Sequence, residues 1–458
     1  MMGRRSTRGR MTAGLAHASH LENVRFTLTC LLPSMLRGLA IPLPFWAEVA
    51  TRFDTGRGVA TVERLTERYA GRPVLFRGVR GQTLVVLAAS DVRRVLEAPV
   101  SVYGMNAAEK RRLLSPFAPD ALNASPPDLH AQRRPFNEAV LDYGHEPHRL
   151  AERFLRVVRE EVVGMLADPG VADHERSLAA FRRIARRCAL GDAAADDTEL
   201  SQEHSRLRVD GDWLGLKFWN RRRNERLRAS MDGRIQRYVA AAEPGTLVSL
   251  FTSAPKEAET RPNGQVPFWL MALDAVRIAV FNALALLTTH PAALGRAVAE
   301  VRMADAAHGP GTVAGLADLA FVRACLLDSV RLWPAAALLA RVTAAETEWY
   351  GETLPIGTRV LIPVAAHHRA RRLPHANRFA PDLWLDGSAD ADWQMNVFSR
   401  GDAQCAGRNL ALLLGTASLA ELLRQAEFEL LRPKLAPDRP LPYGINPLNV
   451  RFAVRGTR

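Results

Sequence analysis

Apolar residues recur every three or four positions between about residues 145 and 300, which is the period of helices that bury one face. The pattern predicts an amphipathic helix over residues 148–167 and a pair of helices over residues 200–242. Residues 268–290 are apolar nearly all round, as in a helix that is buried centrally or that crosses a membrane. Three polar residues within this segment favour burial, namely Asp274, Arg277 and Asn282.

A second, shorter pattern predicts strands. Residues 73–79 and 83–89 are rich in β-forming side chains and flank a turn, which indicates a hairpin. Ser90 and Asp91 are expected to cap the short helix that follows. Residues 343–363 predict another turn-rich β section, and a last helix begins directly after the fourth cysteine of the chain.

These elements predict a mainly α protein with a small β region built from both ends of the chain. We expect one large helical domain with minor sheets over residues 51–458, preceded by a partly disordered N-terminal arm over residues 1–50. The apolar stretch in that arm is interrupted by Pro33 and Arg37, so we expect no transmembrane anchor. Only four cysteines occur in 458 residues and none forms a CxxC pair, which favours a reducing, cytoplasmic setting.

The net charge of +13 first suggests an acidic partner. The basic residues are scattered arginines, however, and no nucleic-acid motif accompanies them, so we expect no nucleic acid. An arginine-rich solvated surface explains most of the charge, and docking of an acidic electron-transfer protein is the more specific alternative.

The loop before the last helix carries the most specific pattern. Phe398, Gly401, Cys405 and Gly407 stand in an F-x-x-G-x-x-x-C-x-G arrangement. An apolar ring can cover a ligating sulfur, and Gly401 allows a tight turn that brings backbone amides near it. Cys405 lies just before a helix, whose N-terminal dipole favours a thiolate, and Gly407 permits close approach of a flat cofactor. The alternative for Cys405 is a buried core cysteine, which is our reading of the other three.

This loop resembles the haem-binding signature of the cytochrome P-450 family, and the order of elements from about residue 50 onwards is similar to that family. The resemblance implies the cytochrome P-450 fold and haem b (iron protoporphyrin IX) with Cys405 as axial metal ligand. It implies that Phe398, Gly401 and Gly407 contribute to cofactor binding.

Two further segments resemble structural and propionate-binding motifs of the family. Residues 328–334 resemble its E-x-x-R helix, with Asp328 in place of Glu and Arg331 one turn away. Arg341 is similar to the family arginine that binds a haem propionate. In residues 377–384, Leu383 stands where the family usually has an arginine, so we expect the ion-pair network to be incomplete.

Residues 125–136 resemble the family's H-x-x-x-R segment, which nominates His130 and Arg134 as propionate contacts. Pro135 suits a first helical turn, so the helix is expected to start near Arg134 and leave His130 in the preceding loop. In the cysteine loop, Ser399 replaces a usual glycine and Ala403 replaces a usual arginine or histidine, which removes one expected propionate contact.

Residues 271–275 align by position with the oxygen-groove motif of the family's central helix. Asp274 matches its acid, whereas Ala275 replaces its threonine, so any proton relay needs water, a substrate hydroxyl or Asp274 itself. We nominate Asp274 and Ala275 as the catalytic positions. Arg277 is the expected ion-pair partner of Asp274, and the alternatives for Asp274 are a buried ion pair, a proton relay or a substrate contact.

The resemblance implies an oxidoreductase: a soluble, bacterial-type haem-thiolate monooxygenase that inserts one oxygen atom from O2 into a small apolar molecule, as in secondary metabolism. Without a flavin or nicotinamide motif, electrons are expected from a separate ferredoxin or flavodoxin-like donor that docks near Arg400 and Arg408. Ala275 favours an alternative that does not activate O2, such as a peroxygenase, isomerase or dehydratase. Asp328, Leu383 and Ala403 keep a non-catalytic relative open. The substrate, its regiochemistry and the oligomeric state are not determined by these patterns.

Overall fold

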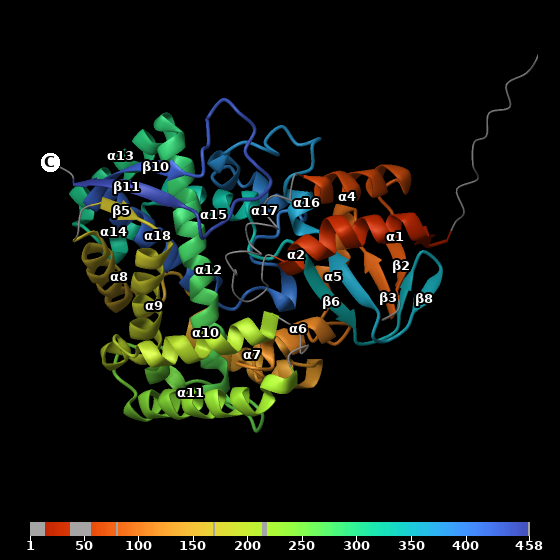
Figure 1. Cartoon of the computed structure of the whole chain (residues 1–458), viewed down its shortest axis with the longest axis horizontal. Coiled ribbons are helices and arrows are strands. Elements are labelled where there is room, and N and C mark those ends of the chain that lie inside the picture. The colour runs from red at the N-terminus through yellow and green to blue at the C-terminus, as the bar shows by residue number, and fades with distance from the viewer. Residues whose placement is uncertain (1–13, 37–55, 79–80, 168–169, 213–217, 457–458) are drawn as a thin grey trace, which may run out of the picture.

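The computed structural model describes residues 14–36, 56–78, 81–167, 170–212 and 218–456, and Figure 1 shows their arrangement. Helices dominate the described residues. The six-stranded sheet lies to one side of the helical body, and the sheet of β5, β10 and β11 packs against its helices. The prediction of a mainly α protein with a small β region is confirmed. The main helices of the body are α7 (Pro127–Leu141), α8 (Ala151–Leu166), α9 (His174–Leu190), α10 (Thr198–Asp212), α11 (Arg221–Ala241), α12 (Pro262–Thr289), α13 (Pro291–His308), α15 (Ala320–Leu332) and α18 (Arg408–Gln425).

The shorter helices connect this body to the sheets. They are α1 (His20–Phe26), a π-helical turn (Thr27–Leu31), α2 (Leu32–Leu36), α4 (Arg57–Arg68), α5 (Ala89–Glu97), α6 (Ala108–Leu114), α14 (Val313–Ala317), α16 (Val364–His368) and α17 (Ser388–Ala391), with 3-10 turns at Leu122–Ala124, Asp192–Ala194, Phe218–Asn220, Val248–Thr252, Pro381–Trp384 and Gly401–Ala403.

The largest sheet has the strand order β1-β2-β3-β9-β6-β4 and joins both ends of the chain, as the sequence predicts. Its strands are β1 (Ala16–His17), β2 (Val74–Gly78), β3 (Gly81–Val85), β9 (Arg359–Ile362), β6 (Leu339–Thr343) and β4 (Tyr103–Gly104). The predicted hairpin is β2–β3, antiparallel with Val74 opposite Val85, and β3 then pairs in parallel with β9. The smaller sheets are β10 (Ala426–Arg432), β11 (Arg451–Gly456) and β5 (Gly170–Ala172), and β7 (Thr347–Trp349) with β8 (Glu352–Leu354).

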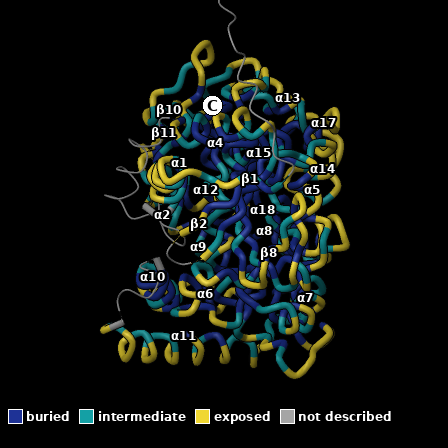
Figure 2. The backbone as a smooth tube through the Cα atoms, turned by 90° about the vertical axis from the view of Figure 1, so that its right-hand side faces the viewer, coloured by how far each residue is buried: buried dark blue, intermediate teal, exposed yellow. Residues whose placement is uncertain are grey.

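Helix α12 runs through the centre of the body, with α9, α15 and α18 packed around it (Figure 1). It is long and apolar enough to cross a membrane, but 67% of its most apolar window is buried inside the protein. The buried positions gather in the middle of the molecule and the exposed ones at its rim, for instance along the outer side of α11 (Figure 2). The burial predicted for this helix from its polar residues is confirmed.

Three predicted helix boundaries are wrong. Helix α12 begins at Pro262, six residues before the predicted start, because a proline fits the first turn of a helix. Helix α7 begins at Pro127 for the same reason and contains Pro135, so His130 lies within the helix and not in a preceding loop. Helix α5 begins at Ala89 after Ala88, so Ser90 and Asp91 belong to its first turn and do not cap it.

The described part of the predicted N-terminal arm, residues 14–36, forms β1, α1 and α2. Strand β1 pairs in parallel with β2. Phe26 at the end of α1 stacks on Phe76 of β2, with ring centroids 5.0 Å apart. The side chain of Phe26 is 2% exposed. This segment therefore contributes to a small apolar core beside the largest sheet.

Candidate functional site

The cysteine loop enters α18 through a tight turn. The N–H of Cys405 donates to the carbonyl of Phe398 at 2.9 Å, and the N–H of Gln404 donates to that of Gly401 at 2.8 Å. Gly401 has a φ of 64°, and a Cβ at this position would lie 1.9 Å from the carbonyl oxygen of Leu96. Only glycine fits there, as its place in the sequence pattern predicts.

The thiol of Cys405 faces a large internal cavity and is accessible from it. Burial within the protein raises the pKa of this thiol, while the N–H of Gly407 and the charges of Arg134 and Arg408 act to lower it. Gly407 is the residue that precedes α18, and a Cβ on it would meet no protein atom closer than Leu141 Cδ1 at 3.8 Å. The N–H of Gly407 and the two arginines therefore lie on one side of the sulfur, and the cavity lies on the other side.

The cavity has a volume of about 2270 Å³ and separates the cysteine loop from α12. Phe398 and Cys405 line it on the loop side. Ala272, Ala275 and Ala279 line it along α12 at a spacing of three and four residues, together with larger side chains of the same helix. The structure therefore brings the predicted ligand Cys405 and the predicted catalytic position Ala275 to one cavity.

Cationic groups gather at the β6 side of this cavity. Arg341 is 1% exposed and bonds to the Oγ of Ser399 at 2.9 Å and to the carbonyl of Ala340 at 3.0 Å. Burial lowers its pKa to about 10. Lys110 of α6 also lines the cavity, and burial together with the charge of Arg341 lowers its pKa to about 7.

His130 lies next to these cations. It is 4% exposed, and its Nε2 has no hydrogen-bond partner among the described residues. Burial and the charges of Arg134, Arg341 and Lys110 lower its pKa to about 4, so the ring is neutral at pH 7. The ring nitrogen is buried, has no partner among the described residues and lies beside three cations. An anionic group of a ligand would accept its hydrogen bond and balance these charges. Lys110 was not predicted, because nothing in its local sequence sets it apart from its basic neighbours.

Arg134 is placed differently from Arg341. It donates from Nη1 to the carbonyl of Gln404 at 2.5 Å and from Nε to Glu138 at 2.6 Å. Its guanidinium also lies over the ring of Tyr143. Arg134 thus fastens α7 to the cysteine loop, one residue before the thiol. Its predicted contact with a propionate stays a prediction.

Asp328 and Arg331 form a fully buried, bidentate ion pair in α15, with N–O distances of 2.5 and 3.1 Å. Arg331 also donates to the carbonyl of Arg378 at 2.7 Å. The Asp328 carboxylate accepts from the N–H of Ala380 at 2.8 Å and from the indole of Trp384 at 3.3 Å. Residue 383 is a leucine, so no second cation comes from that position, and the indole of Trp384 is a neutral donor to the same carboxylate.

The predicted partner of Asp274 is wrong. Asp274 pairs with Arg208 of α10, whereas Arg277 turns to the Oγ of Ser177 in α9 at 3.2 Å. Burial acts to raise the pKa of Asp274, but Arg208, Arg182 and Arg277 outweigh it and lower this pKa. Asp274 is thus held as a carboxylate that accepts hydrogen bonds. The i+3 spacing does not bring the two side chains of α12 together, because tertiary partners on α9 and α10 compete for each of them.

Arg400 has a structural role in this structure. Its guanidinium donates to the carbonyls of Asp390 at 2.7 Å and Asp392 at 3.0 Å, and it stacks over Trp393. These bonds hold the cysteine loop against α17. Arg408 is the first residue of α18 and acts on the Cys405 thiol by its charge.

Residues 271–449 match the family model of cytochrome P450. The chain is similar to cyclooctat-9-en-7-ol 5-monooxygenase of Streptomyces melanosporofaciens, with 32% identity over 202 residues that make up 42% of this chain and 44% of the relative. It is similar to cytochrome P450 4c3 of Drosophila melanogaster, with 28% identity over 40% of this chain and 36% of the relative. It is also similar to methyltetrahydroprotoberberine 14-monooxygenase of Papaver somniferum, with 29% identity over 40% and 37%. The aligned part thus spans less than half the length of each of these relatives.

The matched region is therefore similar to the cytochrome P450 superfamily, and the helical body with small sheets is consistent with the fold of that family. The cofactor of the family is haem b with a cysteine thiolate as axial ligand. Cys405 is the cysteine that faces the cavity, whereas Cys325, the other one in the matched region, is fully buried. The residues fit the cofactor, because an accessible thiol, a large cavity, and cations beside an unpartnered histidine nitrogen meet the needs of its iron, macrocycle and propionates.

Proposed function

We propose that this protein is a haem-thiolate monooxygenase that inserts one oxygen atom from O2 into a small, largely apolar molecule. The observation that carries the proposal is the Cys405 thiol, which opens into the cavity opposite the alanines of α12. When bound, the haem supplies the activation of oxygen, and a thiolate ligand favours O–O cleavage. The two relatives named as monooxygenases support the same class of reaction.

Each group of the site has a proposed task. Cys405 binds the iron, and Arg341, Lys110 and His130 bind the propionates, which compensates for Ala403. Gly401 shapes the loop, Phe398 covers the sulfur, and Gly407 donates its N–H to it. The buried pair of Asp328 and Arg331 fixes α15 to the segment of residues 375–384.

The groups that would supply protons differ most from the motif that the sequence resembles. Ala275 has no hydroxyl, and the charges around Asp274 keep its carboxyl ionised. We propose that Asp274 accepts a hydrogen bond from a water molecule in the cavity. This water would donate the proton that oxygen activation by the bound haem requires. Because this arrangement is weaker than a direct alcohol relay, a peroxide-driven reaction is the second candidate function.

Electrons are proposed to come from a separate ferredoxin or flavodoxin-like protein that docks beside the cysteine loop. The net charge of +13 favours an acidic partner. Arg408 is the candidate contact, since the bonds of Arg400 to carbonyl groups favour a structural role for that residue. We further propose that the protein is a soluble, bacterial-type enzyme of the cytoplasm and that it acts in secondary metabolism.

The haem ligand is tested by the carbon-monoxide difference spectrum of the reduced protein. We expect a maximum at the position typical of thiolate ligation, and Cys405→Ala should abolish it because the sulfur ligand is lost. Cys325→Ala is the control, since Cys325 is fully buried in the core. A protein that takes up no haem would overturn the proposal. Product formed with peroxide, but never with ferredoxin, its reductase and NADPH, would select the second candidate.

A further inference from the structure

Two arginines at the wall of the cavity have hydroxyl groups as hydrogen-bond acceptors and no ion-paired carboxylate among the described residues. Arg182 of α9 donates to the Oγ of Ser205 at 2.7 Å. Arg277 of α12 donates to the Oγ of Ser177 at 3.2 Å. Both arginines line the same cavity as Cys405. A hydroxyl group satisfies a guanidinium donor but carries no charge to balance it, and burying a charge without an ion-pair partner is costly.

Arg277 shows the imbalance most clearly. It is 3% exposed, and its Nε donates to no group among the described residues. Burial lowers its pKa to about 10, and the neighbouring charges of Arg182 and Arg208 act in the same direction. The three arginines are thus close enough to repel each other, and a buried donor remains unused.

Two of the three carboxylates on this part of the cavity wall are engaged elsewhere, and the third is exposed. Asp274 pairs with Arg208. Asp173 caps the start of α9 by accepting from the N–H groups of Glu175 and Arg176, and the Glu175 side chain is exposed. The pair of Arg182 and Arg277 therefore retains positive charge that faces the cavity.

We propose that Arg182 and Arg277 form an anion subsite and that the substrate carries a carboxylate on an otherwise apolar body. This inference rests on the proposed function, since it takes the molecule bound here to be the one that is oxidised. The planar fork of each guanidinium matches the two oxygens of a carboxylate. The rest of the cavity near α12 is lined by apolar side chains such as Phe268, Met271 and Leu178, which suit an apolar body.

The pairing of Asp274 with Arg208 then sets the strength of the subsite. The Asp274 carboxylate attracts Arg182 and Arg277 as well as Arg208. It therefore competes with a bound carboxylate for the same positive charge. Removing this charge should strengthen the binding of an anion, whereas a purely structural ion cluster would only lose stability.

The test is calorimetric titration of the haem-loaded protein with decanoate and with decan-1-ol, which share a chain length and differ in charge. We expect the wild type to bind decanoate at least about tenfold more tightly, because a charge-assisted hydrogen bond is of this order. Arg277→Gln should remove this preference. Arg206→Gln, an exposed change on α10 with the same loss of charge, should keep it. Asp274→Asn should tighten decanoate several-fold and leave decan-1-ol unchanged.

Equal binding of the two probes by the wild type would overturn the subsite, as would an unchanged preference in Arg277→Gln. If Arg277→Gln does not fold, Asp274→Asn decides, and weaker or unchanged decanoate binding in that variant overturns the proposal. The carbon-monoxide spectrum of each sample keeps the two proposals apart. A normal spectrum without carboxylate preference refutes the subsite alone, whereas a missing spectrum refutes the proposed function.

Discussion

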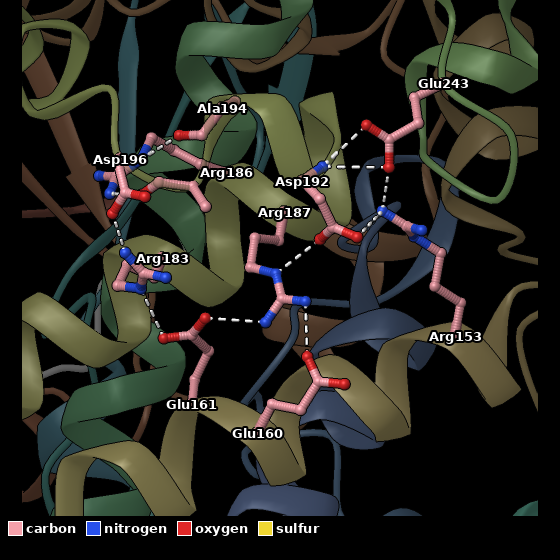
Figure 3. Close-up of polar contacts among 11 residues, drawn as sticks. Arg153, Glu160, Glu161, Arg183, Arg186, Arg187, Asp192, Ala194, Asp196 and Glu243 are labelled. Carbon is pink, nitrogen blue, oxygen red and sulfur yellow. Dashed lines mark hydrogen bonds and ion pairs between the residues drawn. The ribbon is translucent and has the colours of Figure 1, made fainter.

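Neighbouring arginines of helix α9 meet opposite surroundings. Arg183 and Arg187 belong to an ion-pair network with Glu160, Glu161 and Asp192, which Figure 3 shows. Arg182, one residue before Arg183, faces the cavity and bonds to a serine hydroxyl. Arginines on one helix thus belong to an ion-pair network with balanced charges on one side of the helix and to a cavity wall with excess positive charge on the other.

The direction of the pKa shifts reflects this difference. The bonds to Glu161 and Asp196 raise the pKa of Arg183. Burial acts to lower the pKa of Arg187, but its bonds to carboxylates outweigh burial and raise it. Burial and the charge of Arg208 lower the pKa of Arg182 against the attraction of Asp274. The carboxylates around Arg183 and Arg187 balance their charges, whereas the charge of Arg182 at the cavity wall is only partly balanced by Asp274.

The largest expected effect is on the balanced side. Arg187→Ala leaves Glu161, whose side chain is 9% exposed, without one of its two cations, so we expect a loss of about 2 kcal/mol of unfolding free energy. Urea denaturation followed by circular dichroism measures it. Arg187→Ala combined with Glu161→Gln should lose less stability than the sum of the two single changes, because the charge of Glu161 is then absent and is not left without Arg187. Strict additivity would show that the network does not act as a unit.

A smaller effect separates the adjacent arginines. Arg182→Gln should weaken decanoate binding about tenfold, because one charge-assisted bond is lost. Arg183→Gln should leave decanoate binding unchanged and lower the stability by about 1 kcal/mol, as for a partly exposed ion pair. Titration calorimetry and urea denaturation on both variants give the two readouts. If Arg182→Gln and Arg183→Gln change decanoate binding equally, or change stability equally, the two arginines do not differ in role.

The smallest expected effect is in the pH dependence of stability on the cavity side. Burial lowers the pKa of His174 from 6.5 to about 4, and Arg277 and Arg182 act in the same direction against Asp173 and Asp274. Between these two pH values the unfolded chain binds the proton and the folded protein does not. Stability therefore falls as the pH falls through this window. His174→Gln should remove that part of the slope.

The network side should respond at lower pH. Burial acts to raise the pKa of Asp192, but its bonds to Arg187 and the charge of Arg153 outweigh it and lower the pKa below 3.8. The stability that Asp192 contributes is present above that value and is lost as the pH falls below it. Melting temperatures of wild type, His174→Gln and Asp192→Asn between pH 7 and pH 3 separate the two windows. A His174→Gln variant with the slope of the wild type between pH 6.5 and 4 would contradict the assignment.

Local patterns predicted the parts of this protein that depend on neighbours in the chain. The helix periods gave α8, α10 and α11, and the alternation around Gly81 gave the β2–β3 hairpin. The glycine spacing in the cysteine loop was informative for a steric reason, since a Cβ at Gly401 would overlap a backbone oxygen. Helix starts were less well predicted, because Pro127 and Pro262 fit a first turn and extend the helices beyond the apolar pattern.

Contacts between distant segments could not be predicted in this way. The sequence placed Asp274 beside Arg277, but the structure pairs Asp274 with Arg208, which lies 66 residues earlier. It left the Asp328 network without a second cation, and the structure adds the indole of Trp384 as a neutral donor from 56 residues away. Lys110 joins Arg341 and His130 only because α6 and α7 meet β6 at the cavity.

The sequence by itself determined the helical body, the small sheet shared by both ends of the chain, and Cys405 as the ligand candidate. These follow from periodicity and from steric limits that act over a few residues. Only the tertiary structure decided which charges are paired. A side chain is satisfied by whichever partner the fold brings within about 3 Å, at any separation along the chain. Among the described residues, Arg182 and Arg277 bond to hydroxyl groups and not to a carboxylate, and this property of the tertiary arrangement carries the subsite proposal.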